Sequence, residues 1–339
     1  MLLLVGRDGR APTAASLPVM QAVVRYEYGS VDRIELANLP EPVPGKGQVL
    51  VRVRAVSLNA SDVESLKGRP LYTRIFGLLR PKVPVLGTDL AGVVEAVGPG
   101  VTRFQPGDEV LGDNIGFGGT LCELTLVPEK ALLKKPSAIS FSDAACLPQA
   151  GAIAYQGIVR RGELVPGQRV LINGAGGGSG TLAIQLAKGL GAHVTGVDNA
   201  HKQGLMRESG ADRTLDYAQD DYTRGAPPYD LILDLVGNRP LADVARVLAP
   251  GGRYWLVGGS VWRLLSALIL GRFFARGGRR LGLLIVELMG GVPELLEACV
   301  RGTIQPIVSQ RFPLARAKDA IEQVARGRAL GKLVIDVGS

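Results

Sequence analysis

A glycine-rich turn between two apolar segments is the part of this sequence that points most directly to chemistry. Residues 170–173 are apolar enough for a buried strand, residues 174–180 are dense in glycine, and residues 181–188 favour a helix with one apolar face. The turn follows the G-x-G-x-x-G pattern, with alanine in the first place, which allows the backbone to approach a pyrophosphate closely. The free N–H groups at the start of the helix favour phosphate binding. The pattern therefore predicts a dinucleotide site at Ala175, Gly176, Gly177, Gly178, Ser179 and Gly180.

An acidic residue lies where a ribose-binding group is expected. Residues 193–197 form a second apolar strand pattern that ends at Asp198, about twenty residues after the turn. A carboxylate there favours NADH, because it binds the ribose 2′-OH and repels a 2′-phosphate. His201 and Lys202 follow closely and could supply positive charge for NADPH. The sequence therefore leaves the choice between NAD and NADP open, and a glycine-rich loop of some other α/β protein is the alternative to a nucleotide site.

The elements around this turn indicate two domains in an α/β protein. Short strand patterns separated by turn signals occupy the first part of the chain, which is typical of a β-rich, barrel-like domain. From about residue 166 the pattern alternates between strand and helix, as in a doubly wound parallel sheet. The last strands return to the first domain. We expect a β-rich domain at 20–147 and 290–339, a Rossmann domain at 148–289, and a disordered tail at 1–19.

Three segments carry more specific expectations. Residues 143–149 are alanine-rich and favour a helix, and residues 281–288 favour a strand. Residues 261–275 are apolar nearly all round, which predicts a helix that is buried or lies at an interface. A membrane-surface helix is the alternative, although the arginines are too few per turn for a proper basic face.

Composition excludes several classes of protein. The chain of 339 residues is 46% hydrophobic and 21% charged, as in an ordinary globular protein of two domains. No apolar run approaches the roughly 20 residues that a membrane span requires, and the apolar start of the tail is too short for a signal peptide. The three cysteines are far apart and form no C-x-x-C pair, which argues against disulfides and a structural zinc cluster. We expect a cytoplasmic protein.

The net charge of +8 does not by itself indicate nucleic-acid binding. That function requires basic residues on one face together with aromatic residues for base stacking. Here the arginines are scattered, and aromatic residues make up only 5% of the chain. A basic protein that binds an anionic cofactor is a sufficient explanation.

Several sequence motifs, taken together and in their order along the chain, resemble those of the zinc-independent quinone oxidoreductase branch of the medium-chain dehydrogenase/reductase superfamily. They are residues 56–62, 84–94, 104–110, the glycine turn and 331–334, and the likeness extends from Met20 to Val337. The subgroup with the reticulon-interacting mitochondrial reductase and related bacterial NAD(P)-dependent enzymes is the most similar. The resemblance implies a GroES-like β domain around a Rossmann domain, with the active site in the cleft between them. It also implies a homodimer joined through the Rossmann edge strand, at residues 281–288.

The resemblance also bears on the metal and on the reaction. Zinc-dependent relatives place a cysteine and a G-H-E motif where this chain has Asn59 or its neighbours and Gly87-Thr88-Asp89, and the two histidines lie in the Rossmann half. We therefore expect no catalytic zinc, and no Lewis acid to lower the pKa of an alcohol. Hydride transfer from NAD(P)H to a quinone or an α,β-unsaturated carbonyl is the expected reaction. The alternatives are a metal-free alcohol or aldehyde dehydrogenase, or a non-catalytic nucleotide-binding or membrane-associated adaptor.

The motif match assigns roles to individual residues. Asn59 and Asp62 are expected near the nicotinamide and its ribose, with Asn59 donating to the developing oxyanion; a helix cap is the alternative for Asn59. Tyr72 is a candidate proton donor, unless it only packs against Phe76. A solvated lysine is the alternative for Lys332. Ile153 departs from the threonine of relatives. The other expected cofactor contacts are Tyr217, Val236, Gly258, Gly259 and Lys332.

Overall fold

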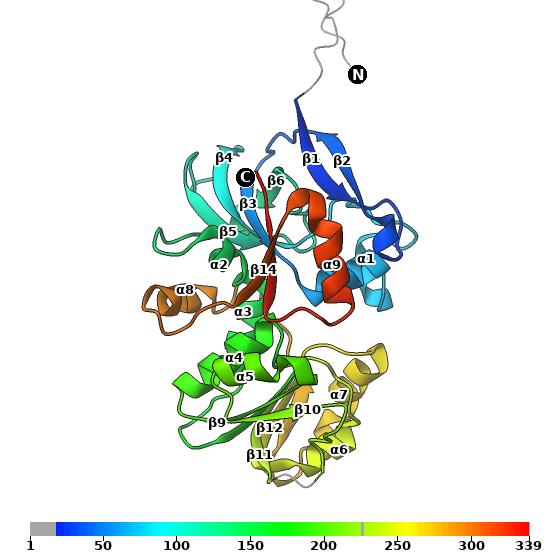
Figure 1. Ribbon diagram of the computed structural model, residues 1–339, viewed down its shortest axis with the longest axis vertical. Coiled ribbons are helices and arrows are strands. Elements are labelled where there is room, and N and C mark those ends of the chain that lie inside the picture. The colour runs from blue at the N-terminus through cyan, green and yellow to red at the C-terminus, as the bar shows by residue number, and fades with distance from the viewer. Residues whose placement is uncertain (1–17, 225–226, 339) are drawn as a thin grey trace, which may run out of the picture.

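The computed structural model describes residues 18–224 and 227–338, and most of the predicted tail lies outside these ranges. Figure 1 shows two groups of elements, one above the other. The upper group contains both early and late parts of the chain, because β3 (Gln48–Ser57) lies beside β15 (Lys332–Asp336). The chain therefore returns to its first domain at its end, as the sequence predicted.

The upper group is built on a mixed sheet. Its strands in spatial order are β14 (Val308–Pro313), β15, β3, β4 (Asp89–Val97), β5 (Glu109–Asp113) and β7 (Leu132–Lys134), and β6 (Leu124–Pro128) also pairs with β3. Only the pair β14–β15 is parallel. A hairpin of β1 (Val19–Val24) and β2 (Glu35–Pro40) and the helices α1 (Ala60–Lys67), α2 (Phe141–Ala145) and α9 (Ala317–Ala325) complete this group.

The lower group is a parallel sheet of six strands with helices around it (Figure 1). Its strands in spatial order are β10 (Arg213–Asp216), β9 (His193–Asp198), β8 (Arg169–Asn173), β11 (Tyr229–Asp234), β12 (Leu248–Leu256) and β13 (Arg280–Leu283). Its helices are α4 (Gly178–Gly189), α5 (Gln203–Glu208), α6 (Leu241–Arg246) and α7 (Val261–Phe274). This is the doubly wound order, which confirms the predicted α/β fold class.

The strand order reverses between β8 and β11, and this reversal creates a crevice at the carboxyl ends of the two strands. The helices α3 (Pro148–Tyr155) and α8 (Val292–Val300) pack against each other where the two groups meet. One continuous buried cluster contains Ile172 from β8, Ala152 from α3 and Val334 from β15. The two groups therefore share a core beside the crevice.

Two predicted elements differ from the structure. The helix expected at 143–149 is interrupted after α2, because Pro148 has no N–H with which to continue the helix and instead begins α3. The strand expected at 281–288 ends at Leu283. Farther on, the backbone N–H and C=O of Glu287 bind the side chain of Gln156, at 2.9 and 2.8 Å, instead of a neighbouring strand. The homodimer through this edge stays a prediction.

The helix α7 is not buried within the chain. Its buried residues are Ala267 and Gly271, which face the sheet beside β13, whereas Trp262 and Phe273 are largely exposed. The helix is therefore not buried by the rest of this chain, and the expectation that it lies at an interface stays a prediction. An all-round apolar pattern cannot distinguish a covered face from an uncovered one. Among the described residues, no helix is both long enough and apolar enough to cross a bilayer.

Candidate functional site

A cavity of about 760 Å³ lies at the crevice and is lined by residues of both groups of elements. The lower group contributes the glycine turn, the end of β9 and the loops after β11 and β12. The upper group contributes the start of α1, the end of β5 and the residues just before and at the start of β15. The predicted site residues that line it are Asn59, Tyr72, Gly177, Gly178, Ser179, Gly180, Asp198, Lys202, Tyr217, Val236, Gly258 and Lys332.

The glycine turn fits a dinucleotide pyrophosphate. The helix α4 begins at Gly178, so the first N–H groups of that helix face the cavity without partners in the helix itself. A Cβ on Gly176 would lie 2.6 Å from carbons of the Lys202 side chain, and a Cβ on Gly178 would collide with the Lys332 side chain. Ala175 is fully buried under the turn. Neither Ala175 nor Gly176 lines the cavity, so both shape the turn from behind.

Gly180 packs the helix against the strand, and its replacement gives a sharp test of the turn. A Cβ there would lie 2.5 Å from Ala175 Cα, so Gly180→Ala should push α4 away from β8. We expect a loss of about 1–3 kcal/mol in the free energy of unfolding and at least roughly tenfold weaker NAD(P)H binding. Thermal denaturation and NAD(P)H fluorescence titration measure the two effects.

Gly189, in the same helix, provides the matched control. Nothing lies within 4 Å of a Cβ at Gly189, so Gly189→Ala should raise stability by roughly 0.5–1 kcal/mol through helix propensity. Cofactor binding should not change in this variant. Equal behaviour of the two variants would contradict the packing argument.

Asp198 binds the protein backbone as well as facing the cavity. Its two carboxylate oxygens accept hydrogen bonds from the N–H groups of Gly176, at 3.0 Å, and Asn199, at 2.9 Å. Lys202 Nζ lies 3.4 Å from the same carboxylate, and both side chains are buried. Tyr217, which donates its N–H to the Asp198 carbonyl, is half exposed nearby. The predicted adenosine-side residues Asp198, Lys202 and Tyr217 therefore lie together.

Asn59 and Lys332 belong to a buried polar cluster that reaches the glycine turn, where the Lys332 side chain packs against Gly178. The Asn59 amide donates to Asp89 Oδ2 at 2.9 Å and accepts from Lys332 Nζ at 2.7 Å. Lys332 Nζ also donates to the Leu58 carbonyl at 2.9 Å and lies 3.8 Å from Asp89 Oδ2. Lys332 is 3% exposed, so the solvated alternative for this lysine is wrong. One amide N–H of Asn59 has its direction fixed by Asp89, which leaves the second N–H for a ligand.

Asp62 does not line the cavity. It is buried beneath Asn59, and its carboxylate accepts the Asn59 backbone N–H at 2.7 Å at the start of α1. Burial raises the pKa of Asp62 to about 7. The expected place of Asp62 near the nicotinamide and its ribose stays a prediction. In the structure its carboxylate caps the first turn of α1 and does not face the cavity. Asn59 is the N-cap residue of α1, as its alternative interpretation held, and also lines the cavity.

Asp113, at the end of β5, is a cavity residue that the sequence analysis missed. It is 2% exposed, its Oδ1 accepts the Ile115 N–H at 2.9 Å, and it lines the cavity together with Asn59. Burial first, and then the neighbouring charge of Asp89, raise the pKa of Asp113 to about 8, with Asp62 adding to the shift and Lys332 opposing it. Burial and the Asp89 charge therefore favour the protonated form of the Asp113 carboxyl.

Asp89 differs from its two acidic neighbours because donors surround it. Its carboxylate accepts from Ser57 Oγ at 3.1 Å and from the Gln149 N–H at 3.1 Å, in addition to Asn59. Burial raises the pKa of Asp89, while Lys332 and these hydrogen bonds lower it. With a single lysine among three buried carboxyls, Asp89 is the group best placed to carry the negative charge.

Tyr72 lies at the rim of the cavity. Its hydroxyl is 3.4 Å from Glu64 Oε2, and burial followed by the charge of Glu64 raises the pKa of Tyr72 to about 12. It is therefore a weaker acid than Asp113. The side chain of Phe76, its alternative packing partner, lies outside the described residues.

Most of the remaining residues expected to contact the cofactor line the cavity. Val236, Gly258 and Ile153 line the cavity. Gly259, in the loop after β12, does not line it and packs against Gly237 in the loop after β11. Within the described parts of the chain, no three His, Cys, Asp or Glu side chains are arranged to hold a metal ion.

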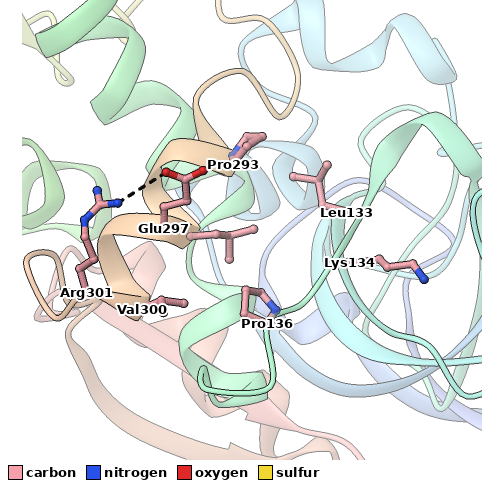
Figure 2. Close-up of a pocket in the computed structure, with 8 residues that line it drawn as sticks. Leu133, Lys134, Pro136, Pro293, Glu297, Val300 and Arg301 are labelled. Atoms are coloured by element: carbon pink, nitrogen blue, oxygen red, sulfur yellow. Dashed lines mark hydrogen bonds and ion pairs between the residues drawn. The ribbon is translucent and has the colours of Figure 1, made fainter.

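A second hollow lies away from these residues. Figure 2 shows its lining side chains, which come from α8 and from the segment around β7, and its volume is about 440 Å³. The pair Arg301–Glu297, at 3.5 Å, joins two exposed side chains on one helix turn. None of the predicted site residues lies there, so the chemistry belongs to the cavity at the crevice.

The fold and the cavity together define a dinucleotide-binding oxidoreductase with a β-rich partner domain. Two family models match the chain: an alcohol dehydrogenase GroES-like domain at residues 45–137 and a zinc-binding dehydrogenase domain at residues 209–335. This chain belongs to the medium-chain dehydrogenase/reductase superfamily, in its quinone oxidoreductase branch.

Curated and solved relatives extend over nearly the whole chain. It is 32% identical to the 2-methylene-furan-3-one reductase of Solanum lycopersicum, over 95% of this chain and 81% of the relative. It is 30% identical to the quinone oxidoreductase QR1 of Triphysaria versicolor, over 94% and 98%. The solved quinone oxidoreductase of Coxiella burnetii is 27% identical, with a TM-score of 0.82 over 95% of this chain and all of that one.

Proposed function

We propose that this protein is a metal-independent reductase that uses NAD(P)H to reduce a quinone or an α,β-unsaturated carbonyl. The observation that carries the proposal is one cavity lined both by a glycine turn and by the buried carboxyl of Asp113. The names of the relatives support this substrate class, since they describe reduction of a furanone and of quinones.

In this proposal the cavity residues bind the cofactor, stabilise the charge on the substrate and supply a proton. The N-terminus of α4 and the glycine turn hold the pyrophosphate, and Val236 and Gly258 support the nicotinamide. When bound, NAD(P)H supplies a hydride. As the β-carbon of an enone gains that hydride, its π electrons move to the carbonyl oxygen, where the remaining Asn59 N–H stabilises the negative charge. Asp113 then gives its proton to the enolate, and water from the open cavity returns a proton to the carboxylate.

The adenosine side favours NADH in this proposal. The Asp198 carboxylate lines the cavity at the end of β9, where it meets a ribose 2′-OH and repels a 2′-phosphate. Lys202 is already paired with Asp198 at 3.4 Å, so it is engaged where NADPH would need a free cation.

A steady-state assay of the purified chain tests the proposed function. NADH or NADPH oxidation is followed with a benzoquinone and with an enone, with and without a chelator. We expect turnover with both acceptors, a higher kcat/KM for NADH, and no effect of the chelator. Loss of activity in the chelator would overturn the metal-independent mechanism. Dinucleotide binding without turnover on any acceptor would instead support a non-catalytic adaptor.

A further inference from the structure

Two segments at the rim of the cavity share an unusual composition. Residues 65–88 run from the end of α1 to the start of β4, and residues 261–286 contain α7 and β13. Together they hold ten of the 39 basic residues of the chain and none of its 31 acidic residues, so the rest of the chain is close to neutral. We call these two segments the basic rim.

The basic rim also exposes large apolar side chains. Leu79 is 85% exposed and Trp262 is 80% exposed, and the others with more than half of their surface exposed are Leu71, Ile75, Leu78, Leu268, Ile269, Phe273 and Ile285. Soluble monomers rarely expose such dense apolar groups without a partner. We therefore expect a partner surface to cover these side chains.

Both segments contribute to the cavity itself. Tyr72 lines it from the first segment, and Val286 lines it from the second. In Figure 1, α1, which leads into the first segment, and α7 lie on the same side of the molecule. A surface that covers the basic rim would therefore lie next to the cavity.

We propose that the basic rim docks this protein on an anionic lipid surface. The exposed leucines and Trp262 enter the boundary between head groups and acyl chains, while the arginines and lysines bind the lipid phosphates. Among the described residues, one of the ten cations, Arg280, forms an ion pair, with Glu163, so the other nine carry uncompensated charge to the partner.

The charge pattern decides between this occupant and a second copy of the chain. A symmetric dimer through the basic rim would place two acid-free, cationic surfaces against each other, which is repulsive. A bilayer with anionic head groups offers both the opposite charge and an apolar interior. An acidic protein partner offers the charge alone, and aliphatic side chains as exposed as Leu79 gain little from it.

Vesicle sedimentation of the full chain tests this proposal. We expect binding to phosphatidylcholine vesicles that contain 30% phosphatidylglycerol to be at least about tenfold stronger than binding to pure phosphatidylcholine, and to weaken as salt is raised. Leu79→Asp and Leu268→Asp should each weaken binding several-fold. Val43→Asp is the matched control, because Val43 is 84% exposed but lies between β2 and β3, outside the basic rim.

The remaining outcomes overturn the proposal. These are absence of binding to the anionic vesicles, equal loss of binding in Val43→Asp, and binding that survives both leucine substitutions. Light scattering measures the oligomeric state. A dimer in solution that Leu268→Asp dissociates would show that the basic rim binds a second copy of the chain instead. The melting temperature of each variant should match that of the parent chain, since all three positions are exposed.

Discussion

Replacing Lys332 with methionine is expected to lower the free energy of unfolding by about 3–5 kcal/mol, the usual cost of removing one partner from a buried ion pair. The ammonium group of Lys332 lies 3.8 Å from Asp89 and binds both Asn59 and the Leu58 carbonyl. Methionine fills a similar volume but leaves the Asp89 charge and two acceptors without this donor. Urea denaturation at pH 7 measures the change.

Two further variants separate the buried charge from other effects. Lys46→Met removes an exposed lysine and should change stability by less than about 0.5 kcal/mol. Asp89→Asn in the Lys332→Met background should recover part of the loss, because it removes the uncompensated carboxylate. A Lys332→Met variant as stable as Lys46→Met would show that the cluster does not depend on this charge.

The sequence predicted the elements that repeat a simple pattern. The glycine turn, the strand that ends at Asp198 and the doubly wound order all follow from local residue types, since each glycine or acidic residue meets a local geometric demand. The position of Lys332 was expected near the cofactor only through the family resemblance. Its burial depends on β15 returning beside β3, which no local pattern reveals.

The acidic cluster could not be read from the sequence for the same reason. Asp62, Asp89 and Asp113 lie on α1, β4 and β5, and an aspartate beside a strand is more often a solvated turn residue than a buried one. Only tertiary packing shows which of the three faces the cavity. The exposure of α7 could not be predicted either, since its apolar pattern fits a buried helix, an interface helix and a membrane-surface helix alike.

The largest effect on catalysis is expected from Asp113→Asn. Asparagine keeps the shape of the side chain and still accepts the Ile115 N–H, but it has no carboxyl proton to transfer. Loss of a general acid typically costs about 10²–10⁴-fold, so we expect kcat on an enone to fall by at least about 100-fold. A benzoquinone should be affected less, because its reduced form is a stabilised phenolate that water protonates readily. Stopped-flow measurement of both acceptors with the same cofactor shows the difference.

The pH profile identifies the proton that Asp113 supplies. The protonated carboxyl is the donor, so kcat/KM for the enone in the parent enzyme should be level at low pH and should fall as the pH rises through about 8. The charged groups that set this value are Asp89, Asp62 and Lys332, and all of them remain in the Asn variant, whose profile should be flat across that range. Asp32→Asn, at an exposed position, should keep both the rate and the profile of the parent. If the Asp113→Asn variant retains the fall near pH 8, another group is responsible for the titration. The dinucleotide affinity of the variant, measured by fluorescence, shows separately whether the proposed cofactor site is intact.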